Sequence, residues 1–488
     1  MNRRQLLGLG VLGGAAALPI ANLLPAGANE VDPVHKGHRL GRKNSGAILM
    51  RPKVAPFTEL MPIPPVLQPS SSANGVDTYR IDIRDATAQL IPGFTTPVLT
   101  YAGSFVGPTI RTRTGRRVKV VYTNRLAAPA NVHLHGGHVA AVNDGHPMDL
   151  IQPGQARTYE YPNAQQGATL WYHDHSHHTE AEHVYRGLHG FYLIDDPSEK
   201  RFALPSGQYD VPIMLRDAAF DQNGGLIFFG DPAERTNFLV NGKLQPYFPV
   251  AARKYRFRIL NAANERVFRL NLGGHQITQI ASDGGLLPEP VRMTEIVLSS
   301  AERAEIVVDF SRLPIGSQLV LHNGTIPVMR FDVVRNASDY SLVPHTLRPL
   351  PALPPASVTR DITMSFDLSG PGPLPVGLVN GRPYDPNRVD AQIRSGATEI
   401  WNVSNVDTLP GVIHNFHLHM THFRVLERDG GPPLPEDEGL KDTVFLPFGG
   451  RVKIQATFGG GFTGRYVYHC HFLEHSSLGM MAEMEIIP

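Results

Sequence analysis

The sequence contains a single cysteine, Cys470, among its 488 residues. One cysteine cannot form a disulfide within the chain, so a disulfide-stapled fold is excluded. Tryptophan is scarce as well, with two residues, and the formal net charge is +1, so nothing indicates binding to nucleic acid or to an anionic membrane surface. Beyond the N-terminus no apolar run is long enough to span a membrane. These absences favour a globular chain that is stabilised by its own cores.

The first 28 residues have the pattern of an export signal. Arg3 and Arg4 precede an uncharged apolar stretch, Leu6 to Ala21, and the small residues Ala-Gly-Ala follow at 26–28. The arginine pair is typical of the twin-arginine route, which carries folded, cofactor-loaded proteins, while a general secretion signal with two basic residues is the alternative. We therefore expect residues 1–28 to be a signal peptide and the protein to be exported, either to a periplasm or out of the cell.

Glycine and proline are abundant, at 47 and 42 residues, which favours short strands and turns over long helices. One pattern occurs three times: a β-rich stretch ends in an asparagine and is followed by an Asp-Gly pair. Successive Asp-Gly pairs lie about one domain length apart. The stretches are RRVKVVYTN (116–124), KYRFRILN (254–261) and TEIWNVSN (398–405), and the Asp-Gly pairs lie at 144–145, 283–284 and 429–430. The chain therefore repeats one pattern three times.

Within each copy apolar and polar residues alternate over short runs, which predicts antiparallel β-sandwiches. Proline-rich stretches precede the first copy and separate the second from the third. The expected organisation is an N-terminal arm over 29–75, a first domain over 76–200, a second over 201–345, a linker over 346–357 and a third domain over 358–488.

Four His-x-His pairs occur in the first and third copies. They are His133/His135, His173/His175, His417/His419 and His469/His471. In a strand, residues two apart face the same side, so each pair presents two imidazoles together, which suits a metal ion. The second copy carries Arg-Leu-Asn-Leu-Gly-Gly (269–274) in place of histidines, as a spacer domain would. We expect a metal site between the first and third copies.

A second possible ligand set surrounds Cys470 and consists of His414, His475 and Met480. Two imidazoles, a thiolate and a thioether are the ligands of a blue copper electron-transfer site, and the soft thiolate favours copper over zinc.

Cys470 itself lies between His469 and His471 and so faces the other side of a strand. The two sites would then lie back to back, joined by the backbone as a path for single electrons. In the first copy Asp174 stands in the place of the cysteine, so only the third copy should hold a blue copper.

These motifs resemble those of the three-domain multicopper oxidases, the group of laccases, bilirubin oxidase and the spore-coat oxidase. The matching runs are HLHG (133–136), WYHDH (171–175), HNFHLH (414–419) and HCHFLEHSSLGMM (469–481). The resemblance covers essentially the whole mature chain. It implies an all-β chain of three cupredoxin-like Greek-key β-sandwich domains. It also implies oxidation of phenolic, aromatic or metal-ion donors, coupled to reduction of O₂ to water.

The resemblance further implies four copper ions with defined ligands. The type 1 copper would bind His414, Cys470, His475 and Met480; the type 2 copper His133 and His417; and the paired type 3 coppers His135, His173, His175, His419, His469 and His471. His475 would be the point where electrons enter, with one ring edge near the surface, because it would bind the type 1 copper from a loop.

Proton supply is the point at which the sequence departs from some relatives, which carry an acidic residue where this chain has Ser476. Asp144 matches an acidic position that relatives have near the copper cluster, and a carboxylate there could relay protons. We expect Asp144 to carry most of the relay, with Glu474 as a weaker candidate. The alternative for Asp144 is plain turn chemistry, since Asp-Gly recurs in all three copies. Other histidines cluster near the first-copy motifs, and we expect some to be hydrogen-bond partners of the ligands and most to be solvated loop residues. They are His138, His146, His177, His178, His183 and His189.

Three other protein classes share part of this residue set with an oxidase. A copper-binding or copper-tolerance protein with incidental oxidase activity would share the ligands, but the twelve methionines form no methionine-rich segment. A copper nitrite reductase lacks the full set of four His-x-His pairs, and a zinc hydrolase leaves the flanked cysteine unexplained. The donor is not identified by the sequence. Because three domains already bring copies one and three together, we expect a monomer.

Overall fold

The computed structural model describes residues 49–50, 54–228, 232–369 and 374–488. The expected signal peptide (1–28) and residues 29–48 and 51–53 of the expected arm lie outside the described residues. The rest of the arm runs along two domains. Leu60 forms a bridge with Tyr247, and Val66 forms one with Thr109.

Each third of the chain forms two packed sheets, so the prediction of an all-β chain with three cupredoxin-like sandwiches is confirmed. In the first domain one sheet has the order β5 (Gly107–Arg113), β10 (His189–Asp195), β9 (Ala168–His173) and β7 (His133–His135). The other has the order β2 (Ser71–Ala73), β3 (Val76–Ala88), β6 (Arg117–Asn124) and β8 (Ala156–Tyr161), with β4 (Thr96–Tyr101) paired to β3.

The second domain has a larger first sheet. Its order is β14 (Lys243–Leu244), β13 (Asn237–Val240), β11 (Asp210–Ala218), β16 (Lys254–Asn261), β21 (Arg303–Asp309), β18 (Ile277–Ser282) and β19 (Gly285–Met293). The facing sheet is β15 (Tyr247–Ala252), β23 (Ile326–Asn336), β22 (Gln318–Asn323), β17 (Phe268–Asn271) and β20 (Glu295–Leu298). A small separate pair joins β1 (Leu49–Met50) to β12 (Phe220–Asp221).

The third domain has two five-stranded sheets. One is β25 (Val376–Val379), β24 (Val358–Asp367), β27 (Thr398–Asn405), β31 (Arg451–Thr457) and β29 (Phe423–Arg428). The other is β26 (Ala391–Arg394), β33 (Met481–Ile487), β32 (Gly464–His469), β28 (His414–Leu418) and β30 (Thr443–Leu446). Two short helices, α1 (Glu180–Arg186) and α2 (Leu473–Ser477), pack against each other.

The three repeated stretches are equivalent strands, β6, β16 and β27, and each pairs in parallel with the first long strand of its domain. The terminal asparagines also act alike, because the amides of Asn124, Asn261 and Asn405 each donate to two carbonyls of the following loops. The prediction of antiparallel sandwiches holds for most strand pairs, but each domain also contains parallel pairs. A Greek-key crossover returns the chain across the sandwich, so strands far apart in sequence run parallel.

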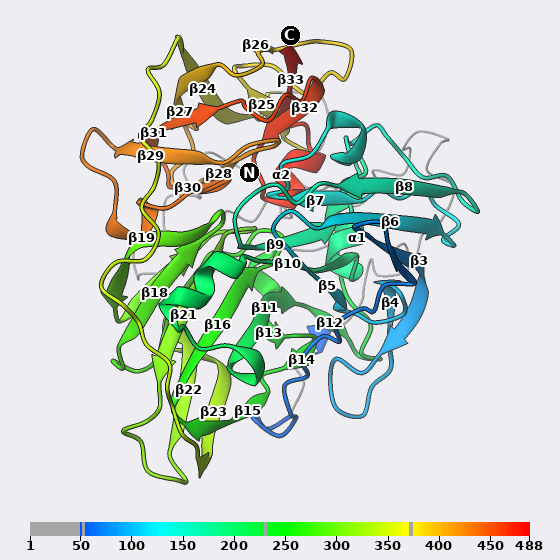
Figure 1. Ribbon diagram of the computed structural model, residues 1–488. Helices are drawn as coiled ribbons and strands as arrows, with labels where there is room; N and C mark the ends of the chain where they lie inside the picture. Colours follow the sequence, from blue (N-terminus) through cyan, green and yellow to red (C-terminus); the bar gives the residue numbers. More distant parts are fainter. Residues whose placement is uncertain (1–48, 51–53, 229–231, 370–373) are drawn as a thin grey trace.

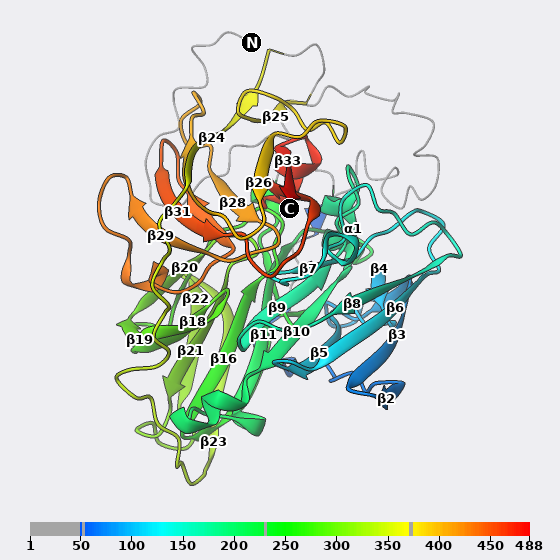
Figure 2. The same ribbon diagram turned by 45° about the horizontal axis from the view of Figure 1, so that its top comes forward.

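The domains meet around a common centre. Figures 1 and 2 show the third domain (yellow to red) lying over the first (blue to cyan) and the second (green). Each sandwich has its own apolar core, and a further buried cluster includes Trp171, Leu260 and Leu473, one residue from each domain. This packing places β7 and β9 of the first domain opposite β28 and β32 of the third.

Candidate metal centre

Eight histidines converge where the first domain faces the third, and each is at most 1% exposed. Strand pairing sets their positions: His133 lies opposite His173 across β7 and β9, and His417 lies opposite His469 across β28 and β32. The other four are His135, His175, His419 and His471. The structure therefore brings together all four His-x-His pairs that the sequence singled out.

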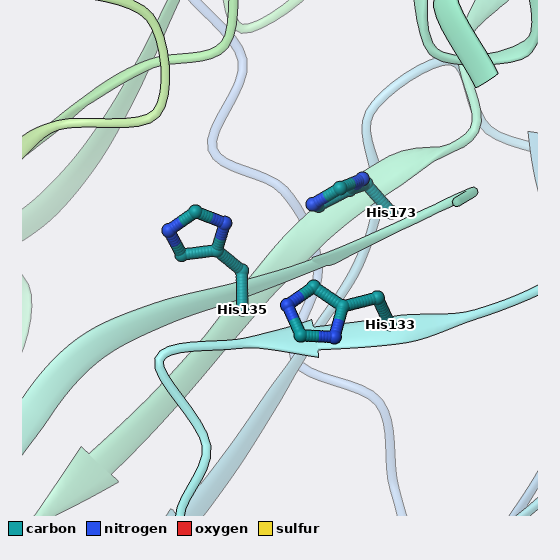
Figure 3. A group of neighbouring side chains, drawn as sticks. All are labelled: His133, His135 and His173. Carbon is teal, nitrogen blue, oxygen red and sulfur yellow. The ribbon is translucent and has the colours of Figure 1, made fainter. Parts of the chain in front are cut away.

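One ring nitrogen of each histidine points into the cluster. The Nε2 atom of His419 lies 3.3 Å from Nε2 of His175 and 3.2 Å from Nε2 of His469. On the other side, Nε2 of His173 lies 3.4 Å from Nε2 of His471. Figure 3 shows the rings of His133, His135 and His173 gathered together from β7 and β9.

Three inward nitrogens have no hydrogen-bond partner among the described residues: Nε2 of His133, Nε2 of His417 and Nδ1 of His135. A buried polar atom without a partner costs free energy, so these atoms indicate a missing ligand. Groups of three histidines lie close enough to hold a metal ion, among them His133 with His417 and His419, and His175 with His419 and His469. Imidazole nitrogens in such groups suit copper.

Six of the eight outer ring nitrogens donate to fixed acceptors. In four histidines Nδ1 donates to a backbone carbonyl: His133 to Asp144 (2.5 Å), His173 to Asp174 (2.8 Å), His417 to Asp442 (2.8 Å) and His469 to Cys470 (2.9 Å). Carboxylates accept from two others: Asp442 from His135 (2.9 Å) and Asp144 from His419 (2.7 Å). A carboxylate oxygen of Glu180 lies 2.6 Å from Nδ1 of His175, without hydrogen-bond geometry, and Nδ1 of His471 has no hydrogen-bond partner among the described residues. A proton on the outer nitrogen leaves the inner lone pair free for a metal.

Burial favours the neutral form of several of these imidazoles. It lowers the pKa well below the usual value for His133, His173, His417, His419, His469 and His471, and neighbouring imidazoles lower it further. Burial also lowers the pKa of His135 to about 4, although Asp442 opposes the shift. Neutral imidazole is the form that binds metal ions.

The second ligand set lies on the other side of the Cys470 backbone. The thiol sulfur of Cys470 is 3.5 Å from Nδ1 of His475 and 3.8 Å from Nδ1 of His414, and the two Nδ1 atoms are 3.1 Å apart. Met480 is buried in the same core, and its carbonyl accepts a hydrogen bond from the Cys470 amide. Burial raises the pKa of the Cys470 thiol to about 12.

The surroundings of His475 differ from expectation in two ways. His475 lies on the short helix α2 rather than in a loop. Its side chain is 3% exposed, with Nε2 3.3 Å from an oxygen of Glu265 and with Phe366 edge-on against the ring. The prediction of a ring edge near the surface is therefore wrong, because a carboxylate of the second domain covers that edge.

Of the two candidates for proton relay, Asp144 lies at the cluster and Glu474 does not. Asp144 is buried and contacts His419, and burial raises the pKa of its carboxyl well above the usual value. The alternative, in which Asp144 belongs to a tight Asp-Gly turn, is supported as well. Gly145 has φ +81°, and a Cβ there would lie 2.1 Å from the Val132 carbonyl oxygen. The hydrogen bonds of Glu474 run instead to Arg235 (2.7 Å) and Asn264 (3.2 Å) in the second domain.

Several residues that hold the site in place were missed by sequence reasoning. Arg303 of the second domain is fully buried, donates to both oxygens of Asp442 and reaches the Thr169 carbonyl in the first domain. Asp442 in turn bonds His135. The only signal in the sequence was a charged residue at the start of an apolar strand, which is too common to single out Arg303. The ligand-free domain thus contributes to the cluster indirectly.

The expectation that most of the six other first-copy histidines are solvated is also wrong, because only His178 among them is exposed. His183 is 7% exposed and lies 3.2 Å from Asp174, which also accepts a hydrogen bond from the Asn131 amide. His138 is partly buried and bonds His422 of the third domain at 2.9 Å.

Two ligand sets of this kind, on opposite sides of the Cys470 backbone in a chain of three cupredoxin-like sandwiches, are typical of a copper oxidase. Sequence models described as multicopper oxidase match residues 82–199, 216–326 and 352–488. The chain belongs to the multicopper oxidase family and is a copper-dependent oxidoreductase that uses O₂.

Individual relatives match almost end to end. A laccase of Bacillus subtilis (strain 168) is 34% identical and aligns over 88% of this chain and 98% of its own length. A bilirubin oxidase of Albifimbria verrucaria is also 34% identical, over 96% of this chain and 88% of its own. Among solved structures, a laccase from Pediococcus acidilactici superimposes with a TM-score of 0.82 at 30% identity, over 89% of this chain and 95% of its own.

Proposed function

We propose that the chain binds four copper ions and oxidises its donor at the Cys470 site while O₂ is reduced at the histidine cluster. In this assignment the type 1 ligands are His414, Cys470, His475 and Met480; the type 2 ligands are His133 and His417; and the type 3 ligands are His135, His173, His175, His419, His469 and His471. The observation that carries the proposal is the set of buried inward nitrogens, three of them without a partner. All twelve ligands come from one chain, which supports a monomer.

Copper bound at these two sites would supply one-electron transfer at the first and multi-electron reduction of O₂ at the second. The protein provides the connection between them. The carbonyl of Cys470 accepts from Nδ1 of His469, so the thiol ligand of one site and a histidine of the other share a covalent link and a hydrogen bond. The ligand residues of both sites are at most 2% exposed, and such burial limits side reactions of partly reduced oxygen.

Protons for water formation are assigned to Asp144. Burial raises the pKa of its carboxyl, which favours the protonated form, and its contact with His419 places the carboxyl at the edge of the cluster. Glu474 is the weaker candidate because its hydrogen bonds run to Arg235 and Asn264.

The donor is assigned to phenolic or other aromatic molecules, or to a metal ion, with His475 as the point where electrons enter. Glu265 lies against the outer edge of His475, and Asp407 contacts Nε2 of His414. Carboxylates there stabilise a donor that becomes positively charged or loses a proton on oxidation. No described helix is long and apolar enough to cross a membrane. We propose export to the periplasm or the exterior, by the twin-arginine route.

Oxygen uptake by the fully copper-loaded protein tests this function. Phenols, bilirubin, Cu(I) and Mn(II) are supplied in turn, and O₂ consumption and hydrogen peroxide are measured. We expect rapid uptake with at least one donor, one O₂ for every four electrons and no peroxide. A fully loaded sample that consumes no oxygen with any donor would favour copper binding or sequestration instead.

A further inference from the structure

Glu180 is a fully buried carboxylate between the two proposed copper sites. It is the first residue of α1, five positions after His175 in the chain. One oxygen lies 2.6 Å from Nδ1 of His175, and the other accepts a hydrogen bond from the hydroxyl of Ser476. Ser476 follows His475 on α2 in the third domain.

A buried carboxylate is expensive unless its partners compensate for lost hydration. Negative charge at a helix start is favourable in itself, but that effect requires no contact with His175. An acceptor on the outer nitrogen of a metal-binding histidine does explain the contact. It fixes the tautomer and ring orientation and makes the inner nitrogen a stronger ligand.

The inner nitrogen of His175 is in the right place for this role. Nε2 of His175 lies 3.3 Å from Nε2 of His419, whose other neighbour is Nε2 of His469 at 3.2 Å. These three nitrogens are one of the groups that can hold a metal ion. His175 is the member that α1 and α2 hold through a shared carboxylate.

We propose that Glu180 is a positioning residue with two tasks, an inference that rests on the proposed copper assignment. Its carboxylate orients His175 toward the type 3 copper, and through Ser476 it ties the cluster to the helix that carries the type 1 ligand His475. The cluster and the electron-accepting site are thus coupled by a side-chain bridge between domains one and three, in addition to the Cys470 backbone.

The test compares Glu180→Gln with Glu182→Gln, a matched control on the same helix. Glu182 bonds Arg186 and lies outside the bridge. The amide variant keeps the shape of the side chain and removes its charge. We expect Glu180→Gln to weaken cluster copper by about 10- to 100-fold in a chelator competition and to reduce the near-ultraviolet absorption of the paired coppers. The blue band should persist, and the melting temperature of the copper-free protein should match that of the control.

Two results would overturn the positioning role. In the first, Glu180→Gln has the same copper affinity and near-ultraviolet absorption as Glu182→Gln. In the second, Glu180→Gln loses the blue band as much as the near-ultraviolet absorption, and its copper-free form has a lower melting temperature. Ser476→Ala tests the bridge separately. It should keep the cluster copper but change the EPR spectrum of the blue copper, and an unchanged spectrum would contradict the coupling. A wild type that lacks both the near-ultraviolet absorption and the blue band would overturn the copper assignment itself. That result differs from the two that overturn only the positioning role.

Discussion

At the scale of single residues, Cys470 joins the two ligand sets. Burial raises the pKa of its thiol to about 12, so copper must displace the thiol proton to bind there. We predict that Cys470→Ser abolishes the blue band and donor oxidation, because serine offers no soft thiolate. The three cluster coppers should still bind, since their ligands face the other way. Metal analysis with the visible spectrum checks this, and a serine variant that stays blue would refute the assignment.

Asp144 has a different role at the same scale. We predict that Asp144→Asn keeps all four coppers but slows O₂ reduction by roughly 100-fold or more, the usual contribution of a positioned proton donor. Donor reduction of the blue copper should proceed at the wild-type rate. Stopped-flow reoxidation by O₂ separates the two steps. Turnover equal to that of the wild type would show that the side chain serves only the Asp-Gly turn.

The ligand histidines could be predicted because they occur in short motifs whose strand alternation fixes their facing. The residues that hold them could not. His135 depends on Asp442, 307 positions away, and His475 is covered by Glu265, 210 positions away. Such contacts arise from domain packing, which leaves no local pattern in the sequence. Asp144 was found only because a resemblance singled out its position.

At the scale of elements, strand β21 links the ligand-free domain to the cluster through Arg303. We predict that Arg303→Met destabilises the copper-free protein by about 3–5 kcal/mol, because the buried Asp442 carboxylate loses its counter-charge. Copper held by His135 and His417 should also be lost. Denaturant unfolding and metal analysis measure both effects.

Arg269→Met provides the control for this substitution, since Arg269 lies in the same domain with a side chain 54% exposed and a surface ion pair to Glu295. Its cost should stay below about 1 kcal/mol. Equal stability of the two variants would contradict the role given to Arg303.

The short helical segment Pro197–Phe202, which leads from the first domain to the second, carries a pH-sensitive group. Burial raises the pKa of Glu199 to about 7, although Arg256 opposes the shift. The folded protein therefore binds more protons than the unfolded chain between about pH 4.5 and 7, and stability from this group is lost as pH rises through that window. Relative to Glu199→Gln, the wild type should lose roughly 1–3 kcal/mol between pH 5 and pH 8. The free energies of unfolding of the copper-free wild type and of Glu199→Gln, measured at both pH values, check this. A difference between the two proteins that is the same at pH 5 and pH 8 would contradict it.

Strand positions were predictable to a useful degree at this scale. The three repeated stretches correspond to β6, β16 and β27. Buried residues alternate with more exposed ones in β6 and β27, whereas β16 is buried on both faces. The parallel pairings were missed because a Greek-key crossover depends on where distant strands return. The helix α2 was missed because five residues carry too little periodicity to be distinguished from a loop.

At the scale of the whole molecule, the histidine cluster lies where separate sandwiches meet. The cluster takes histidines from the first and third domains, while the second supplies Arg303 to Asp442 and Glu265 to the edge of His475. Metal bound between domains favours the folded arrangement over the unfolded chain, so copper loading should stabilise the assembly as a unit.

The central claim is that one chain holds a blue copper and a three-copper cluster back to back. The measurement that tests it most directly is the copper content of the purified protein, taken together with its visible and EPR spectra. The account predicts four coppers per chain, a strong blue band and an EPR signal from one blue and one ordinary copper. Two coppers per chain, or zinc in place of copper, would contradict it.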